Sequence, residues 1–98
     1  MIVEFEDPDL EKLERDPRST LGKGDAVDNG FRKVMQVIRS ARDERDLGAM
    51  RSLRFEKLKG KRSHQCSLRI NKQWRLIVEI QEAENYRRIG VIGVEDYH

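Results

Sequence analysis

The sequence predicts a small α+β domain in which two N-terminal helices pack on a small antiparallel sheet, in the order β-α-α-β-β-β. Two patterns predict this class. Apolar residues recur at helical spacing across positions 25–43, whereas they alternate with polar residues across positions 66–80, as in half-buried strands. Because a chain of 98 residues forms one hydrophobic core, residues 1–98 are expected to be a single domain.

The first elements are short. An apolar run at residues 2–5 suits a first strand. Asp7 is placed to cap a following helix, Pro8 fits the first helical position, and Pro17 ends that helix. Residues 17–24 contain two glycines and a proline, so we expect a loop there.

The second helix is the clearest element. Five apolar residues on one helical face predict a helix over residues 25–43, and intervening polar residues such as Asp28 and Arg32 are expected to face water. The charged stretch at its end is expected to fade into a loop that Leu47 and Met50 anchor on the core. The five apolar residues are Val27, Phe31, Val34, Met35 and Ile38.

The last part of the chain has the two-residue period of strands. Residues 66–70 and 74–80 form two alternating strands, and the three residues between them have the right length for a hairpin turn. Residues 88–94 form a final apolar strand, and residues 55–58 form an additional one. Trp74 is expected to pack in the core.

Composition excludes several classes of protein. No apolar run approaches the roughly 20 residues that a membrane span needs. A single cysteine, Cys66, cannot form an internal disulfide or a zinc cluster, and its place in an alternating strand predicts that it is buried. The N-terminus is short and acidic, unlike a basic signal peptide. We therefore expect a cytoplasmic protein with no membrane association, no metal and no cofactor.

Charge is unevenly distributed along the chain. Residues 51–75 carry nine bases and one acid, whereas residues 1–16 carry seven acids and two bases. A localised basic stripe on a small domain is typical of a surface that binds nucleic acid. A solvated basic loop is the alternative interpretation of the charge alone.

Basic residues of the predicted strands and of the turn before them form one candidate site. Arg69 and Arg75 each fall at a polar position of the alternating pattern, in two neighbouring strands. Three more bases lie on the preceding turn: Lys59, Lys61 and Arg62. Together they predict a concave cationic surface that binds RNA phosphates and stabilises the charge of a phosphoryl transition state. The alternative is that they are ordinary solvent-facing residues of a sheet.

The C-terminal tripeptide Asp96-Tyr97-His98 is the second candidate site. RNA cleavage needs a base for the 2′-hydroxyl, an acid for the leaving 5′-oxygen and cations on the phosphate. Histidine can serve in either proton role near neutral pH. Aspartate can orient it or act as the base, and tyrosine can stack on a nucleobase or donate a proton. Against this interpretation, terminal residues usually tolerate change.

Four segments of the chain form one pattern, which is Leu58-Lys59-Gly60-Lys61-Arg62, Ser67-Leu68-Arg69-Ile70-Asn71, Trp74-Arg75-Leu76 and Asp96-Tyr97-His98. In this order and spacing, over residues 53–98, they resemble the HigB branch of the RelE toxin superfamily. The N-terminal half matches more loosely, as a short strand followed by two helices. The resemblance implies a RelE-like fold with a basic concave sheet face opposite two helices.

The resemblance also implies an activity and roles for individual residues. Such toxins of type II toxin–antitoxin systems inhibit translation by cleaving mRNA in the ribosomal A site, through metal-independent attack of the 2′-hydroxyl. Lys59 and Arg75 are then expected to stabilise the scissile phosphate, and residues 96–98 to transfer protons and position the substrate. Arg62 is expected to bind RNA. Supporting phosphate contacts are expected from Lys57, Lys61 and Arg69.

The implied partners are a protein and nucleic acids. A cognate antitoxin is expected, of the helix-turn-helix kind that is similar to HigA, and its complex with the chain is expected to bind operator DNA. The ribosome and mRNA are the expected targets. No membrane partner is implied.

Two positions depart from the pattern of the family, and two other functions stay open. Glu56 stands where some members carry a functional histidine, and Gln73 stands where some carry asparagine. Gyrase poisons of the ParE branch share the fold but generally lack the catalytic tail. A non-catalytic module that binds RNA or DNA needs the basic face alone.

Overall fold

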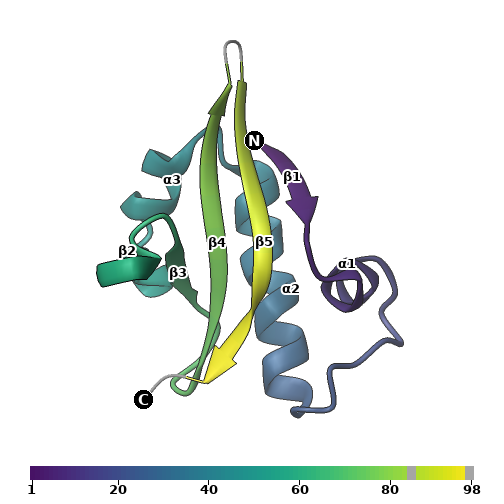
Figure 1. Ribbon diagram of the computed structural model, residues 1–98. Coiled ribbons are helices and arrows are strands. Elements are labelled where there is room, and N and C mark those ends of the chain that lie inside the picture. The colour runs from purple at the N-terminus through teal and green to yellow at the C-terminus, as the bar shows by residue number, and fades with distance from the viewer. Residues whose placement is uncertain (84–85, 97–98) are drawn as a thin grey trace.

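The computed structural model describes residues 1–83 and 86–96, which form a five-stranded sheet with helices against one face (Figure 1). The strand order is β1-β5-β4-β3-β2, so the first and last strands of the chain are neighbours. The α+β class is therefore confirmed. The elements are β1 (Ile2–Phe5), α1 (Pro8–Arg15), α2 (Asp25–Ser40), α3 (Glu44–Ala49), the 3-10 turn η1 (Arg51–Leu53), β2 (Glu56–Lys57), the 3-10 turn η2 (Gly60–Arg62), β3 (Cys66–Arg69), β4 (Trp74–Ala83) and β5 (Tyr86–Asp96).

The first helix begins where the sequence predicts. Pro8 occupies its first turn, and the carboxylate of Asp7 accepts a hydrogen bond from the backbone N–H of Asp9 at 2.9 Å. A cap of this kind stabilises a helix by about 1 kcal/mol. Leu10 and Leu13 are buried because a spacing of three places them on the same helical face, which is turned toward the core.

The second helix ends earlier than predicted, and a third helix follows it. α2 ends at Ser40, and the carboxylate of Asp43 accepts a hydrogen bond from the backbone N–H of Arg45 at 2.9 Å, which starts α3. The prediction of a loop around Leu47 is therefore wrong. Leu47 is fully buried on α3, whereas Met50, just after that helix, is 41% exposed.

The predicted antiparallel meander is confirmed for β3, β4 and β5, but the whole sheet is mixed rather than antiparallel. β1 pairs with β5 in parallel, with Val3 opposite Ile89. A parallel pair needs a long connection, and here most of the chain separates the two strands. β2 forms the other edge and has only two residues, within the predicted strand 55–58.

A β-bulge in β5 decides which of its side chains face the helices. Ile92 is an extra residue between the partners of two consecutive β4 residues. Val91 and Val94 therefore both pack in or against the core, although strict alternation places residues three apart on opposite faces. The same shift turns Gly93 and Glu95 to the other face.

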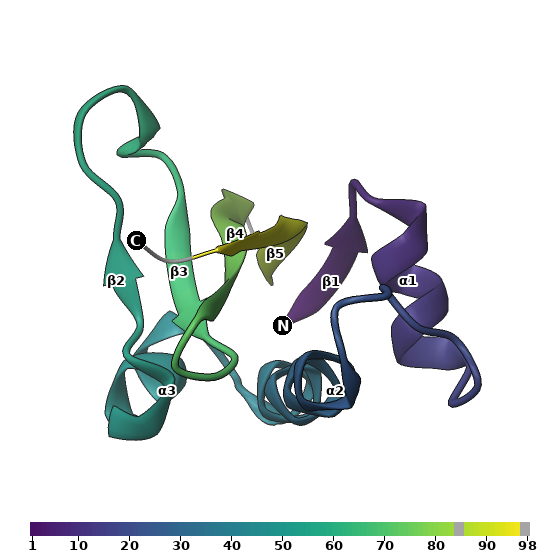
Figure 2. The ribbon, with the colours of Figure 1, turned by 90° about the horizontal axis from the view of Figure 1, so that it is seen from below.

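α2 and α3 cover one face of the sheet, and in the described part of the chain no α-helix covers the other (Figure 2). We call the second face the open face. Leu76 and Val78 of β4 are fully buried against the helices, whereas their neighbours Arg75 and Ile77 belong to the open face. The connection between β2 and β3, which contains η2, projects beyond the open face (Figure 2).

Two side chains lie elsewhere than predicted. Asp28 does not face water: it is 4% exposed, because the loop before α2 folds over it and bonds to its carboxylate. Trp74 is not a core residue: it is only partly buried, and the ammonium group of Lys23 lies over its ring. Among the described residues, no helix has the length and apolar character needed to cross a membrane.

Candidate functional site

A pocket of about 200 Å³ lies on the open face, where β3, β4 and β5 meet β2 and η2. Three residues of the predicted sites lie together in it, namely Arg62, Arg75 and Asp96. Its lining combines two arginines, three carboxylates, a serine and two apolar side chains, which are Arg62, Arg75, Glu56, Glu95, Asp96, Ser67, Leu58 and Ile77.

The buried charged residue of this pocket is Arg75, which has 8% of its surface exposed. Its Nη1 donates a hydrogen bond to the hydroxyl oxygen of Ser67 at 3.0 Å, and a carboxylate oxygen of Glu56 lies 4.0 Å from the same nitrogen. Both partners come from neighbouring strands, since Glu56 and Ser67 are opposite each other in register. The hydroxyl of Ser67 thus orients the planar guanidinium, a group whose fork of N–H donors matches an anion with several oxygens.

Arg62 reaches from η2 to the end of β5. Its Nη1 and Nη2 donate to the two carboxylate oxygens of Glu95 at 3.0 and 2.6 Å, and its Nε donates to the side chain of Gln65 at 3.1 Å. The side chains of Arg62 and Glu95 are each 47% exposed. The hydrogen bonds to Glu95 raise the pKa of the Arg62 guanidinium, so that this group is a permanent cation.

Asp96 ends β5 at the pocket. Its Oδ2 accepts a hydrogen bond from Nε2 of Gln73 at 3.1 Å. Gln73 belongs to the hairpin turn between β3 and β4, in which the side chain of Asn71 accepts two backbone hydrogen bonds. Asp96 is therefore tied to an ordered turn. Tyr97 and His98, the other two predicted tail residues, lie outside the described residues.

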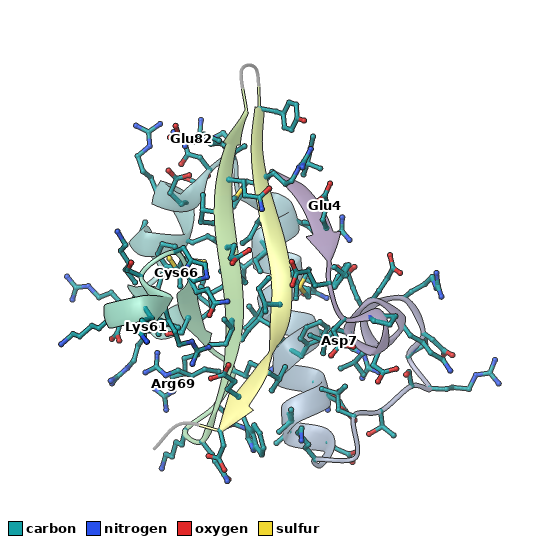
Figure 3. All side chains as sticks on the ribbon, viewed as in Figure 1. Glu4, Asp7, Lys61, Cys66, Arg69 and Glu82 are labelled. Carbon is teal, nitrogen blue, oxygen red and sulfur yellow. The ribbon has the colours of Figure 1, made fainter. Side chains whose placement is uncertain are left out.

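Three predicted RNA-contacting lysines do not line the pocket. Lys57 pairs in register with Cys66 and so lies on the opposite face of β2 from Glu56. Lys59 and Lys61 are exposed, at the start of η2 and within it, and Figure 3 shows Lys61 on the β2 side of the sheet. These lysines therefore belong to the surface around the pocket and not to its lining.

Arg69 is also separated from the pocket, although it pairs in register with Arg75. Its Nε donates to the backbone oxygen of Asn71 at 3.2 Å, and the residue lines a different, mainly apolar groove beside α2. Figure 3 shows Arg69 near the lower end of the sheet. Parity along the strand predicts the face of a side chain, but a long side chain at a strand end can turn away from it.

The sequence predicts a concave cationic surface. The lining of the pocket instead combines two arginines with three carboxylates. The sequence pattern does not reveal Glu95 as a residue of the site, because its place on the open face depends on the bulge at Ile92. Ser67 is not identified either, although its shared parity with Arg69 and Arg75 is a signal that could find it. His64 lies over the same face, with Nε2 at 3.3 Å from a carboxylate oxygen of Glu79.

This arrangement can bind an anion and exchange protons with it. The guanidinium groups of Arg62 and Arg75 are phosphate-binding groups, and the carboxylates beside them can accept a proton. In residues 1–83 and 86–96, no three His, Cys, Asp or Glu side chains gather closely enough to hold a metal ion.

Known proteins of similar structure share this architecture. The YoeB/ParE toxin from Agrobacterium tumefaciens has a TM-score of 0.66 and 19% sequence identity, with all of both chains covered. YafQ from E. coli strain BL21(DE3) has a TM-score of 0.62 and 10% identity, over 96% of this chain and 90% of that one. At such identities these similarities establish the RelE-like fold.

Sequence comparison identifies the family. A family model described as the RelE-like toxin of type II toxin-antitoxin system HigB matches residues 3–89. Toxin HigB-1 of Vibrio cholerae serotype O1 (strain ATCC 39315 / El Tor Inaba N16961) is 33% identical over 79 residues, which are 81% of this chain and 83% of that protein. The chain therefore belongs to the HigB-like toxins of type II toxin–antitoxin systems, a family whose members are paired with a cognate antitoxin.

Proposed function

We propose that the chain is a ribosome-dependent endoribonuclease that cleaves mRNA in the ribosomal A site. The pocket on the open face carries this proposal, because the buried guanidinium of Arg75 lies in it together with Asp96, the first residue of the predicted catalytic tail. Membership of the HigB-like family supports it.

Cations of the pocket bind the scissile phosphate in this proposal. Arg75, oriented by Ser67, donates hydrogen bonds to the phosphate oxygens as their negative charge increases in the transition state. Lys59, exposed beside η2, assists it, and Arg62 binds RNA at the mouth of the pocket. Flanking phosphates are assigned to the cations outside the pocket, which are Lys57, Lys61 and Arg69.

Cleavage proceeds by attack of the 2′-oxygen on the adjacent phosphorus. A base removes the 2′-hydroxyl proton, the bond from the 2′-oxygen to phosphorus forms, and the bond from phosphorus to the 5′-oxygen breaks. An acid then protonates the 5′-oxygen, which leaves a cyclic phosphate and a 5′-hydroxyl end. We assign these proton transfers and the positioning of the substrate to Asp96, Tyr97 and His98, and no step of this scheme requires a metal ion.

The proposed partners follow from this activity. The ribosome presents the mRNA, which places the reaction in the cytoplasm. The cognate antitoxin is proposed to be a helix-turn-helix protein similar to HigA that blocks the open face, and its complex with the toxin is proposed to bind operator DNA.

Mapping of new mRNA 5′ ends in a translating extract tests the proposal. The wild-type chain is compared with a chain that lacks only His98 and with the variant Arg75→Met. The matched control is Arg18→Gln, which removes an exposed arginine from the loop between α1 and α2. Wild type and control are expected to produce cuts that follow the reading frame and need ribosomes, and both site variants are expected to lose them.

Other outcomes assign the chain to a different function. Tight RNA binding without cuts from the wild-type chain overturns the nuclease proposal in favour of a non-catalytic RNA-binding module. Binding to gyrase without cuts overturns it in favour of a gyrase poison. Cuts that persist without His98 remove His98 from the mechanism and leave its proton transfers to Asp96 and Tyr97.

A further inference from the structure

The buried carboxylate of Asp28 holds the loop between α1 and α2 by hydrogen bonds. Asp28 of α2 accepts a hydrogen bond from the hydroxyl of Thr20 at 2.6 Å and from the backbone N–H of Leu21 at 3.1 Å. The same Thr20 oxygen accepts a hydrogen bond from the N–H of Gly22 at 3.0 Å. Burial of a carboxylate costs free energy unless such bonds compensate it, so Asp28 favours one conformation of this loop.

Arg32, one turn further along α2, fastens the first half of the loop. Its Nε donates a hydrogen bond to the carbonyl oxygen of Leu13, at the end of α1, at 3.1 Å. Its Nη2 donates to three more carbonyl oxygens within 3.4 Å, those of Asp16, Pro17 and Ser19. Two polar side chains of α2 are therefore used to order a loop that lies outside the sheet.

The fastened loop brings Lys23 to the end of the sheet. Its ammonium nitrogen lies 4.7 Å from the centroid of the partly buried Trp74 ring, within the range of a cation–π contact. Trp74 pairs in register with Asp96, so Lys23 lies at the same end of the sheet as Asp96. Trp74 alternates with Arg75 and so shares the helix-covered side with Leu76, which means that the RNA strand has to pass around the end of the sheet to reach it. Within the described part of the chain, no carboxylate lies within ion-pair distance of Lys23.

We propose that Lys23 and Trp74 form a nucleotide subsite for the RNA strand that passes through the pocket. The ammonium group of Lys23 moves from the ring to a phosphate of the same strand, and the attached base takes its place on the indole. β2 and the start of α2 lie on opposite sides of the end of β5 (Figure 1), so the strand contacts cations on both sides of Asp96. The inference rests on the proposed function, since it takes RNA as the substrate.

Trp74 is the only tryptophan in the chain, so its fluorescence reports on this subsite. The full chain is titrated with a 2′-O-methylated RNA oligonucleotide, which lacks the attacking hydroxyl and is not cleaved. The emission of Trp74 and the fluorescence anisotropy of a label on the RNA are recorded together. Both signals are expected to change with the same midpoint, and the emission of Trp74 is expected to be quenched.

Variants of Lys23 and Arg18, the two cations of this loop, distinguish binding at a specific subsite from attraction of RNA by net positive charge. Lys23→Gln is expected to weaken RNA binding and to reduce the salt slope of log K by about 0.7, the contribution of one phosphate contact on a single strand. Lys23→Arg is expected to retain the slope. The matched control Arg18→Gln removes the same charge from an exposed side chain and is expected to leave the slope unchanged. The urea midpoint of each variant shows that it is folded.

The possible failures are distinguishable. Equal salt slopes for Lys23→Gln and Arg18→Gln overturn the subsite, and so does RNA binding that leaves the emission of Trp74 unchanged. A wild-type chain that binds no free oligonucleotide overturns the subsite, whereas the proposed function is decided separately by the mapping of mRNA 5′ ends in the translating extract. Cleavage of mRNA that is lost without His98 but is unaffected in Lys23→Gln keeps the function and overturns the subsite.

Discussion

Arg62 and Glu95 form a two-bond ion pair at the mouth of the pocket, with the shorter N–O distance at 2.6 Å. The two oxygens of the carboxylate lie against the guanidinium in the way that two oxygens of a phosphate do. Arg62 comes from η2 and Glu95 from the last strand, so the pair bridges segments that are distant in the chain. In the proposed function, an RNA phosphate bound by Arg62 competes with Glu95 for the same donors.

The first prediction concerns this competition. Glu95→Gln removes the competing charge, and the affinity for a 2′-O-methylated RNA oligonucleotide is expected to rise by about two- to fivefold, the range expected for an exposed ion pair. Fluorescence anisotropy at low salt measures it. Arg62→Gln is expected to weaken binding, and the double variant is expected to behave like Arg62→Gln. A Glu95→Gln variant that binds RNA more weakly than wild type contradicts this interpretation.

The second prediction concerns the orientation of Arg75 by Ser67. Ser67→Ala removes the hydroxyl that holds the guanidinium and is expected to lower the rate of mRNA cleavage by about tenfold, while it costs roughly 0.5–1.5 kcal/mol of stability. Arg75→Lys replaces a planar fork by a point charge and is expected to lose about 100-fold in rate. Primer extension on a translated message measures the rates.

The control for this pair is Ser52→Ala, which changes an exposed serine of η1. It is expected to leave the rate of cleavage unchanged. If Ser67→Ala cleaves at the wild-type rate while its stability falls, Ser67 has a structural role only.

The third prediction compares two helical glycines. A Cβ at Gly30 of α2 would lie 2.7 Å from Cγ2 of Ile70 and 3.0 Å from its backbone oxygen, whereas a Cβ at Gly48 of α3 has nothing within 4 Å. Gly48→Ala is expected to stabilise the protein by about 0.5–1 kcal/mol through helix propensity. Gly30→Ala is expected to destabilise it by a net 1 kcal/mol or so, because the overlap outweighs the same gain.

Urea unfolding of both variants measures these changes in the free energy of unfolding. The double variant Gly30→Ala/Ile70→Ala removes the nearest overlapping methyl and reports how much of the cost came from that contact. Stabilisation by both single alanine substitutions would show that α2 and Ile70, the residue after β3, are not packed as closely as described.

The fourth prediction is a pH dependence. Burial raises the pKa of the Cys66 thiol above its ordinary value, and the nearby charge of Lys57 offsets part of this shift. In the pH window between the unfolded and folded pKa values the folded chain holds more protons, so stability falls as pH rises through that window. The stabilising contribution is fully present below the unfolded pKa.

Alkylation of the single thiol measures this shift directly. The rate of alkylation is expected to reach half its maximum at a higher pH in the folded chain than in the same chain unfolded in urea. Equal midpoints in the two states would mean that the thiol is solvated as in the unfolded chain.

Local patterns in the sequence predicted most of the secondary structure. The cap at Asp7, the five apolar residues of α2 and the alternation along β4 each depend on neighbours in the chain, and each is confirmed. α3 was not predicted because a helix of six residues with one buried side chain, Leu47, shows no apolar period. The end of α2 was predicted too late for a different reason. Charged residues near position 43 suit the end of one helix and the start of the next equally well.

The sequence by itself determined the α+β class, the order of the main elements, and the residue types of the site, among them Arg62, Arg75 and Asp96. The tertiary structure alone decided three features: the parallel pairing of β1 with β5, the bulge at Ile92 that turns Glu95 to the open face, and the loop that brings Lys23 to Trp74. These features depend on strand register and on which surfaces pack together across the whole domain. A pattern that repeats every two or four residues carries no information about strand register or about the packing of distant surfaces.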